Sequence, residues 1–127
     1  MQVLFVEDDP MNRRVVRDML SVVGANMDEA EDAETGLAKI DSGAFNIVLM
    51  DLRMPGMDGL TAIKHLRART DAKRDLPVIV VTADAATDLR ERCLASGADD
   101  VISKPIAMNL LLKAMTRMLS QRTPQTA

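Results

Sequence analysis

Short, uninterrupted apolar segments alternate along this chain with segments of helical periodicity. The most distinct apolar segments are residues 3–6, 47–50 and 78–81. Runs of this length without an intervening polar residue indicate strands that are buried on both faces, as they are in parallel sheets. The pattern therefore predicts an α/β fold in which helices cover both faces of a parallel sheet.

The remaining elements complete the alternation. Two weaker strands are predicted over residues 26–31 and 101–102. Gly24, Gly43 and Gly97 mark the ends of three helices, because glycine readily adopts the conformation that terminates a helix. The predicted helices cover residues 11–23, 33–42, 60–67, 86–96 and 107–120. The resulting order is (βα)5, which makes one domain over residues 1–120 and leaves a short polar tail over residues 121–127.

The composition limits the function classes that fit the chain. Its 127 residues carry a net charge of −3 and give a pI near 5.1, which argues against direct nucleic-acid binding because such proteins usually carry a basic surface. No apolar segment approaches the roughly 20 residues that span a bilayer, and the N-terminus lacks the features of a signal peptide. These features argue against a membrane role. Cys93 is the only cysteine, so no intramolecular disulfide can form, and we expect a cytoplasmic protein.

Polar side chains follow four of the predicted strands directly. Ligands of open parallel sheets bind at the carboxyl ends of the strands, so we expect these side chains to converge at one edge. Grouped carboxylates repel one another unless a cation neutralises them, and oxygen ligands suit Mg²⁺. The residues are Glu7, Asp8 and Asp9 after the first strand, Asp51 after the third, Thr82 after the fourth and Lys104 after the fifth.

A carboxylate at such a site can accept a phosphoryl group and form an acyl phosphate. The transfer depends on positioning and on neutralising the charge that spreads over the phosphoryl oxygens. A metal can serve one oxygen, Lys104 a second, and the Thr82 hydroxyl with nearby backbone N–H groups a third. Taken singly, each residue also has a structural interpretation, such as a helix cap or a solvated loop. Their joint placement at four strand ends favours Asp51 as a phosphoacceptor.

Four segments of the chain resemble the receiver domain of bacterial two-component response regulators of the chemotaxis-regulator type, over about residues 2–120. They are residues 6–9 (VEDD), 50–59 (MDLRMPGMDG), 80–83 (VVTA) and 97–105 (GADDVISKP). The resemblance implies a flavodoxin-like, doubly wound fold with five parallel strands in the order 2-1-3-4-5. It also implies that phosphorylation shifts the population between two conformations.

The resemblance assigns catalytic roles to individual residues. Asp51 matches the phosphoacceptor, and Thr82 and Lys104 match the hydroxyl and the ammonium that contact the phosphoryl group. Ala83 matches the small residue that admits this group. Pro105 matches the partner of Lys104 in a cis peptide bond that is typical of the family.

The resemblance also assigns a metal site for Mg²⁺ or Mn²⁺. Asp8 matches the acid that binds the metal directly, and Glu7 the acid that commonly acts through water. Asp51 and the main-chain carbonyl of Arg53 match the other protein ligands. Asp9 matches no ligand, and we expect it to cap the first helix.

Val101 departs from the family pattern. Receivers usually carry Tyr or Phe at this position, and the ring turns inward as the threonine moves toward the phosphoryl group. Valine has no ring to turn, so we expect the phosphorylation chemistry of Asp51 with a different form of the usual coupling to Thr82. Arg53 and Asp84 are predicted to flank the path of attacking water and to tune the lifetime of the acyl phosphate.

The resemblance implies phosphotransfer from a histidine kinase or a histidine phosphotransfer protein, without enzymatic activity beyond self-phosphorylation and self-dephosphorylation. Output to a protein target is expected through the fourth helix, fifth strand and fifth helix. In that last helix Leu110, Leu111 and Leu112 are consecutive, so they cannot all face the core. Met1 directly precedes the first strand, which favours a stand-alone regulator. A receiver from a hybrid histidine kinase and a docking module that works without phosphate are the alternatives.

Two other classes fit the residues less well. A phosphatase of the haloacid dehalogenase type needs a second aspartate two residues after the nucleophile, where this chain has Arg53. A flavin-binding module needs a phosphate loop rich in Ser, Thr and Gly after the first strand, where this chain has three acids. A Gly-rich phosphate loop of the nucleotide-binding type is also missing from the sequence.

Overall fold

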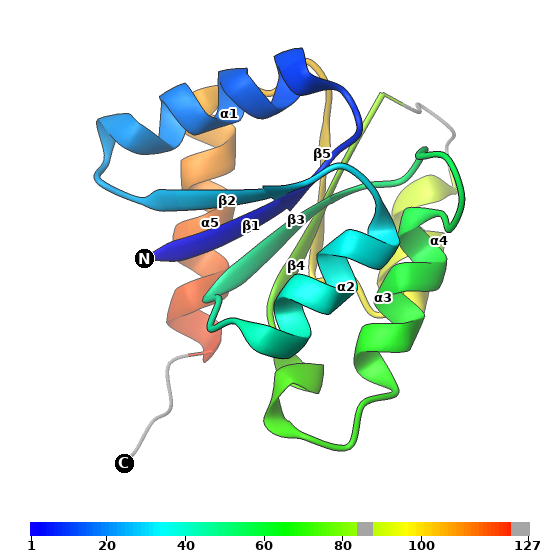
Figure 1. The fold of residues 1–127 in the computed structure, drawn as a ribbon. Helices are drawn as coiled ribbons and strands as arrows, with labels where there is room; N and C mark the ends of the chain where they lie inside the picture. Colours follow the sequence, from blue (N-terminus) through cyan, green and yellow to red (C-terminus); the bar gives the residue numbers. More distant parts are fainter. Residues whose placement is uncertain (84–87, 123–127) are drawn as a thin grey trace.

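The protein folds around one parallel sheet (Figure 1), and the structure, a computed structural model, describes residues 1–83 and 88–122. The five strands pair in the order β2-β1-β3-β4-β5, which confirms the predicted fold class and strand order. The strands are β1 (Gln2–Val6), β2 (Asn26–Ala30), β3 (Ile47–Asp51), β4 (Val78–Thr82) and β5 (Asp100–Ser103).

The helices form two layers, with α1 and α5 on one face of the sheet and α2, α3 and α4 on the other (Figure 1). They are α1 (Pro10–Val22), α2 (Ala33–Ser42), α3 (Gly59–Arg67), α4 (Leu89–Ser96) and α5 (Met108–Arg122). A 3-10 helix, η1 (Ala72–Asp75), lies in the loop before β4 and was not predicted. The last helix continues two residues beyond its predicted end, into the segment expected to be a polar tail. Within the described residues, no helix combines the length and apolar character needed to cross a bilayer.

Both faces of the sheet are buried, which explains the uninterrupted apolar strands. In β1, Val3 and Phe5 pack toward α1 and α5, whereas Leu4 and Val6 pack toward α2, α3 and α4. All four side chains are fully buried, and each such burial contributes on the order of 1.5–3 kcal/mol relative to an exposed side chain. The edge strand β2 is half exposed, and its weaker apolar pattern follows from that position.

Aspartates begin three of the helices. The side chains of Asp9, Asp32 and Asp58 each accept a hydrogen bond from a main-chain N–H two or three residues further along. Caps of this type contribute about 1 kcal/mol each. The Asp9 cap confirms the role predicted for this residue. Because Asp9 and Asp58 lie in the loops that follow β1 and β3, their caps also fix the loops that carry the acidic residues.

Candidate functional site

One hollow at the carboxyl edge of the sheet collects the predicted site residues. Its charged lining residues carry an excess of two negative charges, from four acids and two bases. The loops after β1, β3, β4 and β5 all contribute, as the strand order predicts. The lining residues are Glu7, Asp8, Asp9, Asn12, Asp51, Arg53, Thr82, Ala83 and Lys104.

Three carboxylates form a group that can hold a cation. Glu7, Asp8 and Asp51 each offer one oxygen, and these oxygens all lie within 4.8 Å of one another. Glu7 and Asp51 are buried, and Asp8 is exposed at the mouth. Such an all-oxygen set, with one ligand open to solvent, fits Mg²⁺ or Mn²⁺, which are hard cations that usually retain water ligands.

Lys104 partly neutralises this acidic group. Its Nζ lies 2.7 Å from Oε1 of Glu7 and 3.5 Å from Oδ2 of Asp51. Burial acts to lower the pKa of Lys104, but the hydrogen bond to Glu7 and the charge of Asp51 outweigh it, so the pKa is raised above its ordinary value. Lys104 is therefore a fixed positive charge at the site.

The pKa of Asp8 is raised at its position beside Glu7. Desolvation raises the pKa of its carboxyl, and the hydrogen bond to Glu7 and the charge of Glu7 raise it further, against a weaker lowering by Lys104. A raised pKa means that ionisation of Asp8 is opposed by its neighbours. A divalent cation between the carboxylates would remove this opposition, which is the electrostatic reason to expect a metal here.

The other predicted residues lie around the same hollow. Thr82 is buried at the end of β4, and Ala83 and Arg53 line the opening. The main-chain N–H of Lys104 donates to the carbonyl of Thr82 over 2.8 Å, so the main chains that carry Lys104 and Thr82 lie side by side at the ends of β5 and β4. Asp84, predicted to face Arg53, lies outside the described residues.

Close backbone packing positions Asp51 itself. A Cβ added to Gly59 would overlap the carbonyl oxygen of Asp51 and would lie 3.0 Å from Cα of Leu52. The N–H of Gly59 donates to the carbonyl of Leu52 over 3.0 Å. The start of α3 therefore rests directly on the end of β3, and only a residue without a side chain fits this contact.

Two residues near the acids were not predicted from the sequence. The Asn12 amide donates to Oε1 of Glu7 over 3.4 Å, and Arg13 donates to the main-chain carbonyl of Glu7 over 2.7 Å. Both lie in the first turns of α1, which begins beside the acidic run. Their sequence signal is weak, because polar residues at these helix positions are common on exposed surfaces.

The side of the molecule formed by α4, β5 and α5 holds a buried acid. Asp100 is 5% exposed, and its two carboxylate oxygens bind Arg90 of α4 and Arg117 of α5. Val101 is partly buried against the core cluster that contains α4. Leu110 is 56% exposed whereas Leu111 is fully buried, which confirms that the consecutive leucines of α5 face different environments.

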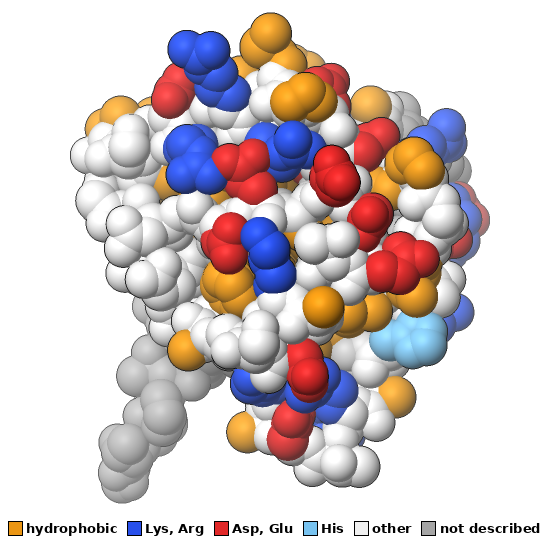
Figure 2. All heavy atoms as spheres, viewed as in Figure 1, with side chains coloured by type: hydrophobic (Ala, Val, Ile, Leu, Met, Phe, Trp, Pro, Cys, Tyr) orange, Lys and Arg blue, Asp and Glu red, His pale blue; other side chains and the backbone are white. Residues whose placement is uncertain are grey.

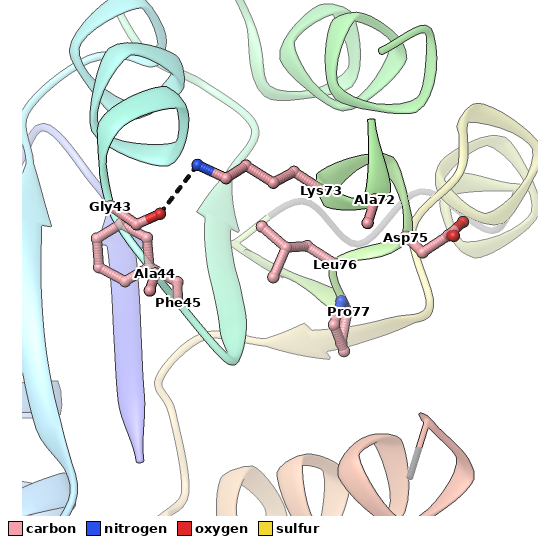
Figure 3. Close-up of a pocket in the computed structure, with 8 residues that line it drawn as sticks. All are labelled: Gly43, Ala44, Phe45, Ala72, Lys73, Asp75, Leu76 and Pro77. Atoms are coloured by element: carbon pink, nitrogen blue, oxygen red, sulfur yellow. Dashed lines mark hydrogen bonds between the residues drawn. The ribbon is translucent and has the colours of Figure 1, made fainter. Parts of the chain in front are cut away.

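A second hollow lies at the amino ends of β3 and β4, opposite the acidic site (Figure 3). Its wall is fixed by Lys73, whose Nζ donates to the carbonyls of Ile40, Asp41 and Gly43 over 2.8, 2.8 and 3.0 Å. Among the described residues that line it, Asp75 is the one acid, so this hollow does not gather metal ligands.

Comparison with known proteins identifies the family. Residues 3–116 match the family described as the response regulator receiver domain. The chain belongs to this family. It is therefore a receiver domain of two-component signalling, as the four matching segments predicted, and the expected cis bond between Lys104 and Pro105 is present.

Curated relatives include both sensor kinases and response regulators. The sensor histidine kinase RcsC of Salmonella typhimurium is 36% identical over 115 residues, which are 91% of this chain and 12% of that protein. The response regulator MprA of Mycolicibacterium vanbaalenii is 37% identical over 123 residues, which are 97% of this chain and 52% of that protein. The chain thus spans only part of the length of these relatives.

Solved structures give the same fold. The receiver domain of the sensor histidine kinase PA1611 from Pseudomonas aeruginosa PAO1 superimposes with a TM-score of 0.85 at 31% identity, covering 94% of this chain and 97% of that one. That structure has a magnesium ion coordinated in its active-site cleft. The chemotaxis protein CheY4 of Vibrio cholerae superimposes with a TM-score of 0.84 at 28% identity, covering 93% of this chain and 98% of that one.

Proposed function

We propose that this receiver accepts a phosphoryl group on Asp51, with Mg²⁺ or Mn²⁺, from a phosphohistidine of a kinase or phosphotransfer protein in the cytoplasm. The observation that carries the proposal is the group of Glu7, Asp8 and Asp51, whose oxygens lie within 4.8 Å of one another beside the ammonium of Lys104. With a divalent cation bound between the carboxylates, such a site would be suited to a transferring phosphoryl group, because the cation and Lys104 would offset the charge on its oxygens.

The residues divide the chemistry between them. An oxygen of Asp51 bonds to phosphorus as the bond from phosphorus to the donor nitrogen breaks, and the imidazole leaves with the electron pair and takes up a proton. Glu7, Asp8, Asp51 and the Arg53 carbonyl would hold a divalent cation, which would neutralise the charge on one phosphoryl oxygen. Lys104 binds a second oxygen. The hydroxyl of Thr82 is suited to the third, and the small side chain of Ala83 leaves room for the group.

Direct phosphorylation tests this proposal. The protein is incubated with acetyl phosphate and Mg²⁺, and intact mass is measured before and after mild alkaline treatment. We expect one labile phosphate adduct, which Asp51→Asn abolishes. Asp18→Asn, which alters an exposed acid in α1, serves as the matched control and retains the adduct. Absence of an adduct on the parent protein would refute phosphoacceptance and would favour a docking module that works without phosphate.

We also propose that Arg53 and Asp84 tune the rate at which water removes the phosphoryl group from Asp51. Arg53 lines the opening of the site, where its side chain would meet an approaching water molecule. Alanine substitutions at the two positions should change the rate at which the adduct is lost without changing its amount at saturation. Equal rates in the parent and in both variants would exclude this role.

For the output, we propose a protein target on the face formed by α4, β5 and α5. This face has a groove that includes Arg90 of α4, Val101 and Ser103 of β5, and Leu110 and Lys113 of α5. The exposed Leu110 offers apolar contact area beside the basic side chains. The groove also adjoins Thr82 through the pairing of Thr82 with Ser103 in the sheet, so a shift at Thr82 has a short path to it.

A phosphate mimic tests the switch. Amide spectra recorded with Mg²⁺ and beryllofluoride should show shifts at Thr82, in α4 and along the groove, although position 101 carries valine. Asp51→Asn should abolish all of them. Shifts confined to the loops around the metal would mean that phosphorylation does not reach the output face.

A further inference from the structure

Arg13 of α1 contacts both β2 and the end of β1. Its Nε donates to Oε1 of Glu29 on β2, and its Nη1 donates to the main-chain carbonyl of Glu7 at the end of β1, both over 2.7 Å. The side chain is only 16% exposed. Arg17 binds the other oxygen of Glu29. Basic and acidic side chains accordingly interleave over this side of the molecule (Figure 2).

The contact of Arg13 with Glu7 lies directly beyond the end of β1, where strand pairing ends. The last registered pairs of β1 are those of Val6 with Ala30 and with Met50. Beyond them, the N–H of Glu7 still donates to Ala30 over 2.9 Å, and the carbonyl of Glu7 receives the guanidinium of Arg13. Glu7 is thus fixed by hydrogen bonds on both sides of its Cα.

The same peptide unit carries the next acid. The carbonyl of Glu7 and the N–H of Asp8 belong to one planar peptide group, so a bond to the carbonyl also sets the direction in which the chain enters Asp8. The side chains on both sides of this peptide, Glu7 and Asp8, belong to the group of carboxylates that could hold a cation. The Arg13 guanidinium also binds Glu29 on β2. Because two hydrogen bonds hold the guanidinium, it cannot rotate freely, and it anchors this peptide group rigidly.

We infer that Arg13 is a positioning residue, which holds the main chain so that Glu7 and Asp8 present their carboxylates to the divalent cation. The inference rests on the proposed metal-dependent function. Arg13 would act through its hydrogen bond to the carbonyl of Glu7, and not through its own positive charge. It therefore strengthens metal binding although it is a cation itself.

The sign of the effect separates the positioning role from simple electrostatics. A positive charge near the acidic group repels Mg²⁺, so loss of the Arg13 charge alone would tighten metal binding. Loss of the anchor would weaken it, since mutations of groups that orient metal ligands commonly reduce affinity by roughly 10–100-fold. The two explanations predict opposite changes for the same substitution.

The decisive experiment is a Mg²⁺ titration of the full chain followed by amide NMR, with Arg13→Gln compared with Arg17→Gln. Each substitution removes one positive charge and one ion pair to Glu29, but only Arg13 contacts the carbonyl of Glu7. We expect roughly tenfold weaker Mg²⁺ binding in Arg13→Gln. We expect Arg17→Gln to bind within about twofold of the parent, or slightly more tightly. Equal or tighter binding in Arg13→Gln would overturn the inference.

Arg13→Lys provides a second variant that retains the charge. A single ammonium cannot bridge Glu29 and Glu7 as the guanidinium does, so we expect weaker Mg²⁺ binding here too, whereas a pure charge effect predicts no change. Urea unfolding in metal-free buffer measures the stability of each variant separately, and we expect the larger loss for Arg13→Gln, because it also removes the hydrogen bond to the carbonyl of Glu7. A parent protein that binds no Mg²⁺ would refute the proposed function. A parent that binds normally beside an unaffected Arg13→Gln would refute the positioning role alone.

Discussion

The ammonium of Lys104 binds Glu7 more closely than it binds Asp51, at 2.7 Å compared with 3.5 Å. The lysine is separated from Glu7 by 97 positions in the sequence. It therefore partly neutralises the carboxylates of Glu7 and Asp51, at the position from which we propose that it binds a phosphoryl oxygen. A cation that enters this site must bind against the charge of Lys104.

Removing that charge should strengthen metal binding. In Lys104→Met we expect Mg²⁺ affinity to rise at least about fivefold, because a unit charge a few ångströms away contributes on the order of 1 kcal/mol or more even when strongly screened. Calorimetric titration measures the change. Lys113→Met, which removes an exposed lysine of α5, is the control and should leave the affinity unchanged. Weaker binding in Lys104→Met would show that the lysine supports the metal site instead of competing with it.

Gly59 should tolerate no side chain. Gly59→Ala places a methyl group against the backbone of Asp51 and Leu52, and we expect a loss of about 2 kcal/mol in the free energy of unfolding. Urea unfolding gives the value, and the amount of phosphate adduct should fall as Asp51 is displaced. Gly24→Ala is the comparison, since Gly24 has open space but a φ of +75° and should lose about 1 kcal/mol. An equal or smaller loss at Gly59 would contradict the packing argument.

Either of the two arginines that bind Asp100, Arg90 or Arg117, should be able to neutralise its buried carboxylate alone. Arg90→Gln or Arg117→Gln alone leaves one cation on the buried carboxylate, so we expect each to lose less than about 1 kcal/mol of stability. The double variant leaves the buried charge of Asp100 without either arginine. We expect it to lose about 1–2 kcal/mol more than the sum of the single losses. Chemical unfolding of the four proteins provides this cycle, and additive losses would mean that the two pairs are independent.

Glu29 should make folding sensitive to acid. Hydrogen bonds from Arg17 and Arg13 lower the pKa of Glu29 below its ordinary value of 4.5. A lowered folded-state pKa gives stability that is fully present above the ordinary value and is lost as the pH falls through the folded-state value. The stability difference between the parent and Glu29→Gln should thus be constant above about pH 5.5 and shrink below pH 4.5. Glu31→Gln, at an exposed neighbouring acid, is the control for the urea unfolding series, and a difference that grows toward low pH would contradict the assignment.

The apolar pattern predicted the sheet because its signal is local. Residues 47–50 and 78–81 are continuous apolar runs, and both lie in central strands that are buried on both faces. The edge strand β2 was harder to predict, since only part of it is buried. The 3-10 helix η1 has no buried residue, so it leaves no periodic apolar signal. Helix α4 begins at Leu89, and positions 86 and 87 of its predicted range lie outside the described residues.

The sequence alone determined the fold class and the inventory of the site. Apolar runs locate the strand ends, and the carboxyl ends of parallel strands must share one edge, so the order of the elements is enough to bring Asp8, Asp51, Thr82 and Lys104 together. Those assignments need only this order and the chemistry of the residues.

Only the tertiary structure decided how these groups are held. The bond of Arg13 to the carbonyl of Glu7, the contact of Gly59 with the backbone of Asp51 and the sharing of Asp100 by two helices depend on distances between elements. Such contacts require the packed arrangement of helices on the sheet, because side-chain reach and main-chain spacing are set in three dimensions and leave no periodic trace along the chain.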